Sequence, residues 1–177
     1  MKVFISTSLD NKYTKNSKKK IYATDFDYYK GHFSKNKIIK NDWENPKLLQ
    51  KNFIKLNKTI KKLGNIFSIQ LSKQNKNVET LIFKKIINVW LVHYVHSYYF
   101  KWKIIDKLLK REKKILFTGF DIDTSKVNTI DTKEYLLNLR SSDYHNYIGY
   151  FKIFKYLEKK GNKNIFFSKK KIKIVSK

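Results

Sequence analysis

The densest run of aromatic side chains, residues 90–102 (WLVHYVHSYYFKW), most constrains how this chain can fold. From residue 81 to residue 99 the sequence is apolar on nearly every side of a helix, which is typical of a helix that is buried on several sides. The segment does not reach the roughly 20 apolar residues that are needed to span a bilayer. We therefore expect a long helix, from about residue 78 to residue 110, at the centre of a packed domain.

Two histidines, His93 and His96, lie one helical turn apart in this run, so both side chains can face one direction. A zinc site needs further ligands, and no Asp or Glu lies near enough in the sequence to complete one. The His-Glu-x-x-His motif of zinc proteases is also absent. We predict no metal site and interpret the two histidines as residues that line the core or a cleft. In a cleft they are the candidate catalytic residues, because histidine can act as a general base or bind phosphate.

The other segments predict helices and strands in alternation. Short apolar runs predict strands that are covered on both faces, at residues 2–7, 21–26, 114–121 and 164–168. Asn45 and Pro46 predict the start of a second long helix. Its apolar residues recur every three or four positions and predict one buried face, formed by Leu49, Phe53, Leu56, Ile60, Leu63 and Phe67.

A third helix is predicted to start at residues 141–143 and to stop at Gly161, with Tyr147, Phe151 and Phe154 on its buried face. Strands that are interleaved with helices indicate an α/β fold. We predict a Rossmann-like, three-layer domain with few, mainly parallel strands and long buried helices.

Polar residues follow two of the predicted strands, where open α/β sheets usually bind ligands. These candidate substrate-binding residues are Ser6, Thr7, Ser8, Thr118, Gly119, Asp121 and Asp123. Backbone N–H groups after a strand can hold a phosphate, and carboxylates there can hold a ribose or act in acid–base chemistry. Neither a GxGxxG nor a GxxxxGK[ST] motif is present, so no dinucleotide or P-loop site, and no cofactor, is predicted.

The net charge of +26 predicts an anionic partner: a small anionic molecule, an anionic membrane surface or a nucleic acid. An AT-rich genome is the other explanation, because the abundant Lys, Asn, Ile, Phe and Tyr all have AT-rich codons. Arginine occurs only at positions 111 and 140, and a nucleic-acid-binding protein would be expected to use more of it. Nucleic acid is therefore the alternative partner. The absence of cysteine fits a cytoplasmic location.

Several segments resemble one known family. Asp42-Trp43 leads into a leucine-rich helix at residues 48–71, and IFKKIINVWL (82–91) precedes the aromatic and histidine run at 93–102. The pattern is similar to the N-terminal part of the LIC12162-type transferases, bacterial proteins that are associated with surface-polysaccharide genes. SDYHNY (142–147) and ISTSL (5–9) resemble further stretches of that family. Phe100-Lys101 stands where the family pattern has Asp-Arg, and Asn88-Val89 where it has Gly-Pro.

The resemblance implies a transferase domain that acts in surface-carbohydrate biosynthesis. Together with the strand order and the polar residues at the strand ends, it predicts the binding of a nucleotide-sugar or another anionic small molecule. Residues 1–177 would then be one α/β domain, equivalent to the N-terminal part of a larger transferase, with a second transferase domain or subunit as its partner. The predicted location is cytoplasmic, and the lysine-rich helix faces predict peripheral contact with the anionic inner face of the membrane, which is compatible with such a transferase. An inactive, truncated remnant of such an enzyme is the alternative.

Overall fold

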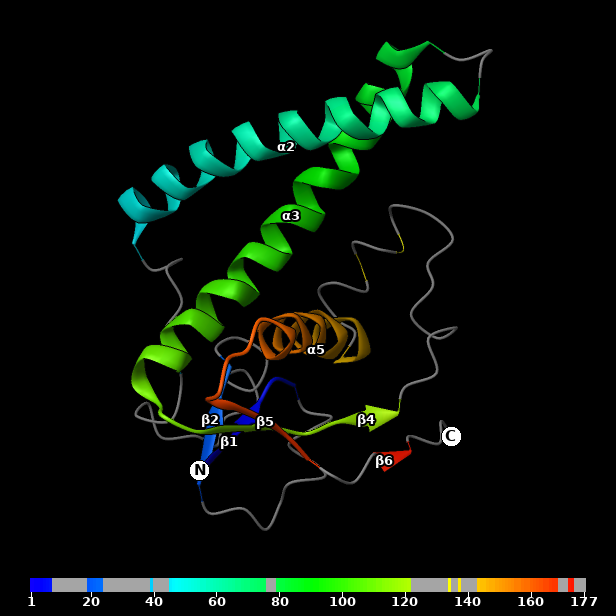
Figure 1. Ribbon diagram of the computed structural model, residues 1–177. Helices are drawn as coiled ribbons and strands as arrows, with labels where there is room; N and C mark the ends of the chain where they lie inside the picture. Colours follow the sequence, from blue (N-terminus) through cyan, green and yellow to red (C-terminus); the bar gives the residue numbers. More distant parts are fainter. Residues whose placement is uncertain are drawn as a thin grey trace. The chain divides into compact units, whose positions relative to one another are not determined.

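Figure 1 shows the computed structural model of the chain. The structure describes residues 1–7, 19–23, 39, 45–75, 79–121, 134, 137, 143–168 and 172–173. Contacts between Cα atoms divide the chain into two compact units, one of residues 1–41 and 101–177 and one of residues 42–100. Two such units can form one domain or two. The single domain that was predicted over residues 1–177 therefore stays a prediction.

The first unit contains a four-stranded parallel sheet. Its strands are β1 (Lys2–Ile5), β2 (Lys20–Tyr22), β3 (Ile115–Phe117) and β5 (Ile165–Phe167), in the order β2-β1-β3-β5. Two further short strands, β4 (Phe120–Asp121) and β6 (Ile172–Lys173), pair with each other, also in parallel. Together with the helices this confirms an α/β fold with a parallel sheet, at the four places where strands were predicted.

One face of this sheet carries an aromatic core against helix α5 (Asp143–Lys159). The ring centroid of Phe117 lies 4.6 Å from that of Phe154 and 5.4 Å from that of Tyr147. Phe4 lies 5.4 Å from Tyr150 in an edge-on arrangement. Such aromatic pairs combine a large buried apolar area with favourable ring geometry. These ring contacts hold α5 against the sheet.

The end of α5 is set by a glycine, as predicted. Gly161 has a φ of 79°, which disfavours residues with a Cβ atom. The N–H of Gly161 donates to the carbonyl of Glu158, and that of Asn162 donates to the carbonyl of Leu157. This pair of hydrogen bonds is a Schellman motif, which satisfies the last carbonyls of the helix.

The second unit contains helix α2 (Pro46–Gln74) and the first part of helix α3 (Thr80–Arg111), which form a hairpin (Figure 1). The predicted start of α2 is confirmed: the side chain of Asn45 accepts a hydrogen bond of 3.1 Å from the N–H of Leu48. The predicted buried face is wrong in part, because Phe53 is 47% exposed and Phe67 is 39% exposed.

The buried face of α2 follows a row at every fourth residue instead: Asn52, Leu56, Ile60, Gly64 and Ser68. Three of these residues are small or polar. Gly64 packs against the side-chain amide of Asn88 on α3, with no room there for a Cβ atom. The spacing of apolar residues therefore predicted the wrong face of α2 for the contact with α3. Close approach of the two helices needs a small residue at the contact rather than a large one.

The extent of α3 is close to the prediction, but its burial is not. In its first three turns Leu81, Ile82, Ile86 and Val89 are each about half exposed, between 48% and 64%. Full burial starts at Leu91 and is most regular in the last part of the helix, which belongs to the first unit, at Ile104, Ile105 and Leu108. An apolar sequence shows that a helix can be buried on several sides, but not how many neighbours it has. The long helix is therefore confirmed, but the prediction that it is buried on several sides from residue 81 onward is wrong for its first three turns.

Candidate functional site

The direction in which the chain adds strands to the sheet reverses between β1 and β3. From β1 the chain goes to β2 on one side of it, and then returns through α2 and α3 to β3 on the other side. In open parallel sheets, ligands bind beyond the carboxyl ends of the strands at such a point. This edge of the sheet is the candidate functional site.

Four of the predicted substrate-binding residues meet at this edge. Ser6 and Thr7 follow β1, and Thr118 and Gly119 follow β3. Because β1 and β3 are adjacent and in register at Phe4 and Phe117, their carboxyl ends lie side by side. The structure therefore brings together residues that follow two different predicted strands; their role in binding stays a prediction.

The hydroxyls of the cluster are buried, with Ser6 and Thr118 each 4% exposed and Thr7 fully buried. The backbone after β3 is also engaged. The N–H of Gly119 donates to Ser168 Oγ (2.9 Å), and the N–H of Phe120 donates to the hydroxyl of Tyr147 (2.9 Å). These two N–H groups already have acceptors in this structure. A phosphate held there would take the place of the Ser168 or Tyr147 oxygen.

The Tyr147 hydroxyl is a hydrogen-bonding bridge that the sequence did not reveal. It accepts from the N–H of Phe120 and donates to the carbonyl of Thr118 (2.8 Å). The tyrosine lies on α5 and is 1% exposed, so the N-terminal turns of α5 are fixed to the end of β3. The spacing had placed Tyr147 on a buried face but gave no sign of its hydroxyl partners.

We expect that replacing Tyr147 with phenylalanine lowers the free energy of unfolding by about 1–3 kcal/mol, because a buried donor and a buried acceptor lose their partner. Urea denaturation of the purified chain measures this change. Tyr156→Phe is the matched control, since Tyr156 lies on the same helix and is 53% exposed. Equal stability of the Tyr147→Phe variant and the unchanged protein would contradict the bridge.

For the three other predicted residues of the site, the described structure gives no side-chain position. Asp121 belongs to β4 and pairs with Lys173 of β6 through the backbone; the position of its side chain is not described. Ser8 and Asp123 lie outside the described residues.

The two candidate catalytic histidines belong to the second unit, whereas the strand ends belong to the first. His93 is exposed. His96 is half-buried and packs between the rings of Phe53, 5.0 Å away, and Phe100, 6.2 Å away. Burial, and after it the nearby His93, lower the pKa of His96 below its ordinary value. The lowered pKa favours the neutral imidazole, which suits an aromatic environment.

Among the described residues, no three His, Asp or Glu side chains could hold a metal ion together. In the same residues, no helix combines the length and the apolarity that crossing a membrane requires.

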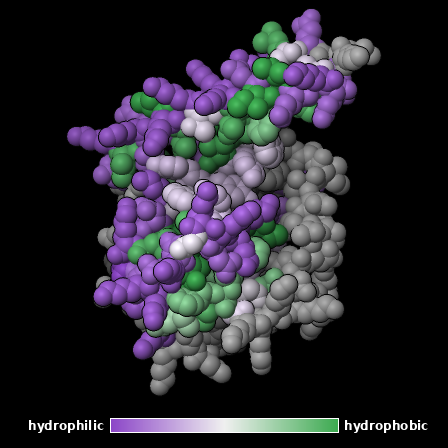
Figure 2. Space-filling view, in the orientation of Figure 1, coloured by the Kyte–Doolittle hydropathy of each residue, from purple (hydrophilic) through white to green (hydrophobic). Residues whose placement is uncertain are grey.

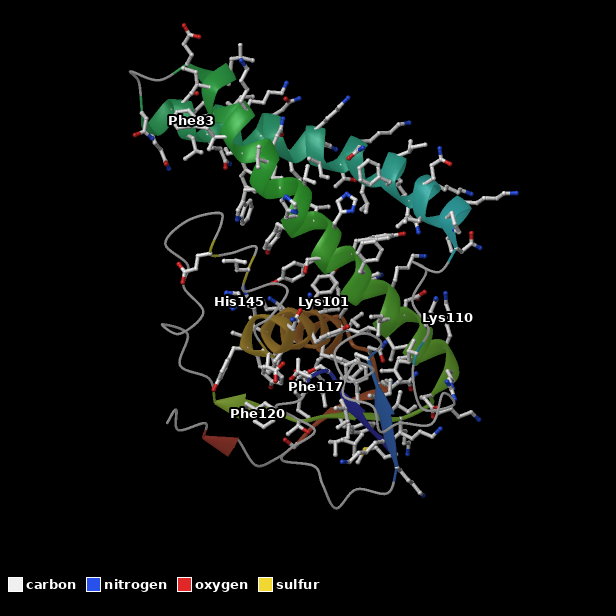
Figure 3. All side chains as sticks on the ribbon, turned by 180° about the vertical axis from the view of Figure 1, so that it is seen from behind. Phe83, Lys101, Lys110, Phe117, Phe120 and His145 are labelled. Carbon is white, nitrogen blue, oxygen red and sulfur yellow. The ribbon has the colours of Figure 1, made fainter. Side chains whose placement is uncertain are left out.

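Lys101 is the unexpected feature of the first unit. Its side chain is only 8% exposed and passes over Gly149 of α5, where a Cβ atom would come within 2.8 Å of Lys101 Cδ. Figure 3 shows Lys101 and Phe117 on opposite sides of α5. Burial lowers the pKa of Lys101 to about 8. The sequence held a signal: Lys101 precedes the buried Ile105 and Leu108 by four and seven positions, so it lies on the same helical face.

Comparisons of the chain with models of protein families, with curated proteins and with solved structures gave no match. The resemblance to the LIC12162-type transferases therefore stays a prediction.

Proposed function

We propose that this chain is a Rossmann-like domain of a transferase that binds a nucleotide-sugar, or another phosphate-bearing small molecule, at the carboxyl ends of β1 and β3. The proposed pathway is surface-carbohydrate biosynthesis in the cytoplasm, and the proposed partner is a second transferase domain or subunit. Pathway and partner rest on the sequence resemblance.

One observation supports the ligand site above all others. The order β2-β1-β3-β5 has its switch point between β1 and β3, and polar, hydroxyl-bearing or glycine residues follow both strands there. Parallel α/β sheets with unrelated activities share this ligand position. Gly119 adds a place where backbone can approach a phosphate closely, since its Cα carries no side chain.

Calorimetric titration of the purified chain with UDP-, GDP- and CMP-sugars tests the proposal. We expect heat of binding with one of the three. The absence of heat with all of them, together with no binding to a separately encoded second half, would overturn it.

Gly119→Ala locates the site. Among the described residues, a Cβ atom at Gly119 would meet only Ser168, at an ordinary contact distance of 3.8 Å, and the φ of Gly119 is not positive, so the variant is expected to fold. The added methyl group would hinder a phosphate that approaches the backbone, and binding should weaken. Lys163→Ala is the control, because it removes one exposed positive charge next to the amino end of β5. If Lys163→Ala weakens binding as much as Gly119→Ala does, the binding is non-specific attraction to the basic chain.

A further inference from the structure

The first turns of α3 carry an exposed aliphatic stripe. Ile82, Ile86 and Val89 recur at four and three residues, so they lie on one face of the helix. They are 48%, 64% and 58% exposed. On α2, Ile54, Ile66 and Ile69 are also 43–56% exposed. Side chains of this kind are normally buried, and a concentration of them on one element marks an interaction surface.

Hydrophilic residues surround the exposed apolar residues of this hairpin, as Figure 2 shows for the face in view. Residues 42–100 contain ten lysines and three carboxylates, a net charge of +7. The exposed lysines are Lys47, Lys51, Lys55, Lys58, Lys61, Lys62, Lys73 and Lys85. The partner of this surface must therefore be both apolar and anionic.

Two other occupants fit these properties less well. A second copy of the chain would bring together two surfaces that both carry this positive charge, and like charges oppose association. The phosphates of a nucleic acid can bind lysines, and its unpaired bases can stack on aromatic side chains. The stripe on α3 consists of isoleucine and valine, which make neither contact.

We propose that the hairpin of α2 and α3 docks onto the surface of an anionic lipid bilayer. Ile82, Ile86 and Val89 enter the boundary between headgroups and acyl chains, while the exposed lysines contact the anionic headgroups. Helices that lie in this boundary combine an aliphatic face with lysines in the same way. Each lysine near an anionic leaflet adds to the attraction. The surface belongs to the second unit, so the inference stands independently of a ligand at the strand ends.

Sedimentation of the full chain with lipid vesicles tests this proposal. One set of vesicles contains phosphatidylcholine alone and the other contains equal parts of phosphatidylcholine and phosphatidylglycerol. We expect binding to the anionic vesicles, with much weaker binding to the neutral ones and at high salt. Equal binding to both sets, or no binding to the anionic set, would overturn the proposal.

A pair of double variants separates insertion from simple charge attraction. Ile86→Gln with Val89→Gln removes the two most exposed aliphatic side chains of the stripe and should weaken anionic-vesicle binding about tenfold or more. Tyr156→Gln with Phe166→Gln changes exposed positions of the other unit, 53% and 39% exposed, and should leave binding unchanged. Equal binding by both double variants would show that the stripe does not insert, and would overturn its assignment.

Two further measurements complete the test. The charge variant Lys58→Gln, Lys61→Gln and Lys62→Gln alters only exposed positions of α2 and should weaken anionic-vesicle binding about fivefold for each lysine that faces the membrane. Unchanged binding in this variant would contradict the role of these lysines. Light scattering of the chain without lipid should give a monomer. A dimer that is lost in the Ile86→Gln, Val89→Gln variant would assign the stripe to a second copy instead.

Discussion

Replacing Phe117 with alanine is expected to lower the free energy of unfolding by about 3–5 kcal/mol, the range for a large aromatic side chain that leaves a cavity in a core. Phe117 is fully buried, and its ring lies within 6.2 Å of the rings of Phe4, Tyr147, Phe151, Phe154 and Phe167. These partners come from two neighbouring strands and from α5. The cavity would therefore open between sheet and helix, where no single residue can move to fill it.

Urea denaturation, followed by near- and far-ultraviolet circular dichroism, measures the effect of Phe117→Ala. Total stabilities of domains are about 5–15 kcal/mol, so complete loss of a cooperative transition is also an outcome that agrees with the expected cost. Phe166→Ala is the matched control, since Phe166 lies on β5 of the same sheet but is 39% exposed. A similar loss of stability in both variants would show that Phe117 is not the centre of the core.

The positions of helices and strands could be predicted because their signals are local. Asn45 and Pro46 mark the start of α2, and Gly161 ends α5 through its backbone conformation, as the structure confirms. Burial could not be predicted as well, because it depends on partners far away in the sequence. The row of α2 that packs runs through Gly64 and Ser68, and no periodicity of large apolar residues indicates such a row.

In the candidate site, too, local features could be predicted and contacts between distant residues could not. Residues that follow strands could be located, since a short apolar run and the polar residues after it are neighbours in the sequence. The contacts that fill the site could not. The Tyr147 hydroxyl bonds to backbone groups 27 and 29 residues away, and Ser168 Oγ bonds to the N–H of Gly119, 49 residues away. The packing of α5 against the sheet brings Tyr147 to the end of β3, and the parallel pairing of β3 with β5 brings Ser168 to Gly119.

Lys101 allows a second prediction of large effect, in which stability depends on pH. Burial lowers the pKa of its amine in the folded chain from the ordinary 10.5 to about 8. Between these two values the unfolded chain binds more protons than the folded chain, so this group makes the protein more stable as the pH rises from 8 to 10.5. The stabilisation is complete above pH 10.5 and is lost as the pH falls toward 8. The gap between the two pKa values corresponds to about 3 kcal/mol.

Lys101→Met removes the buried amine and retains an unbranched side chain over Gly149. At pH 7 we expect the variant to be more stable than the unchanged protein by about 1–3 kcal/mol, because replacing a buried charge with an apolar group of similar volume is often stabilising. The advantage should shrink as the pH rises and vanish above pH 10.5, where the lysine is neutral in both states. Thermal and urea denaturation at pH 7, 8, 9 and 10.5 measure it. Lys152→Met, at an exposed position of α5, should have the same stability as the unchanged protein at every pH. An advantage of Lys101→Met that stays constant across this range would mean that packing, not the desolvated charge, determines the effect.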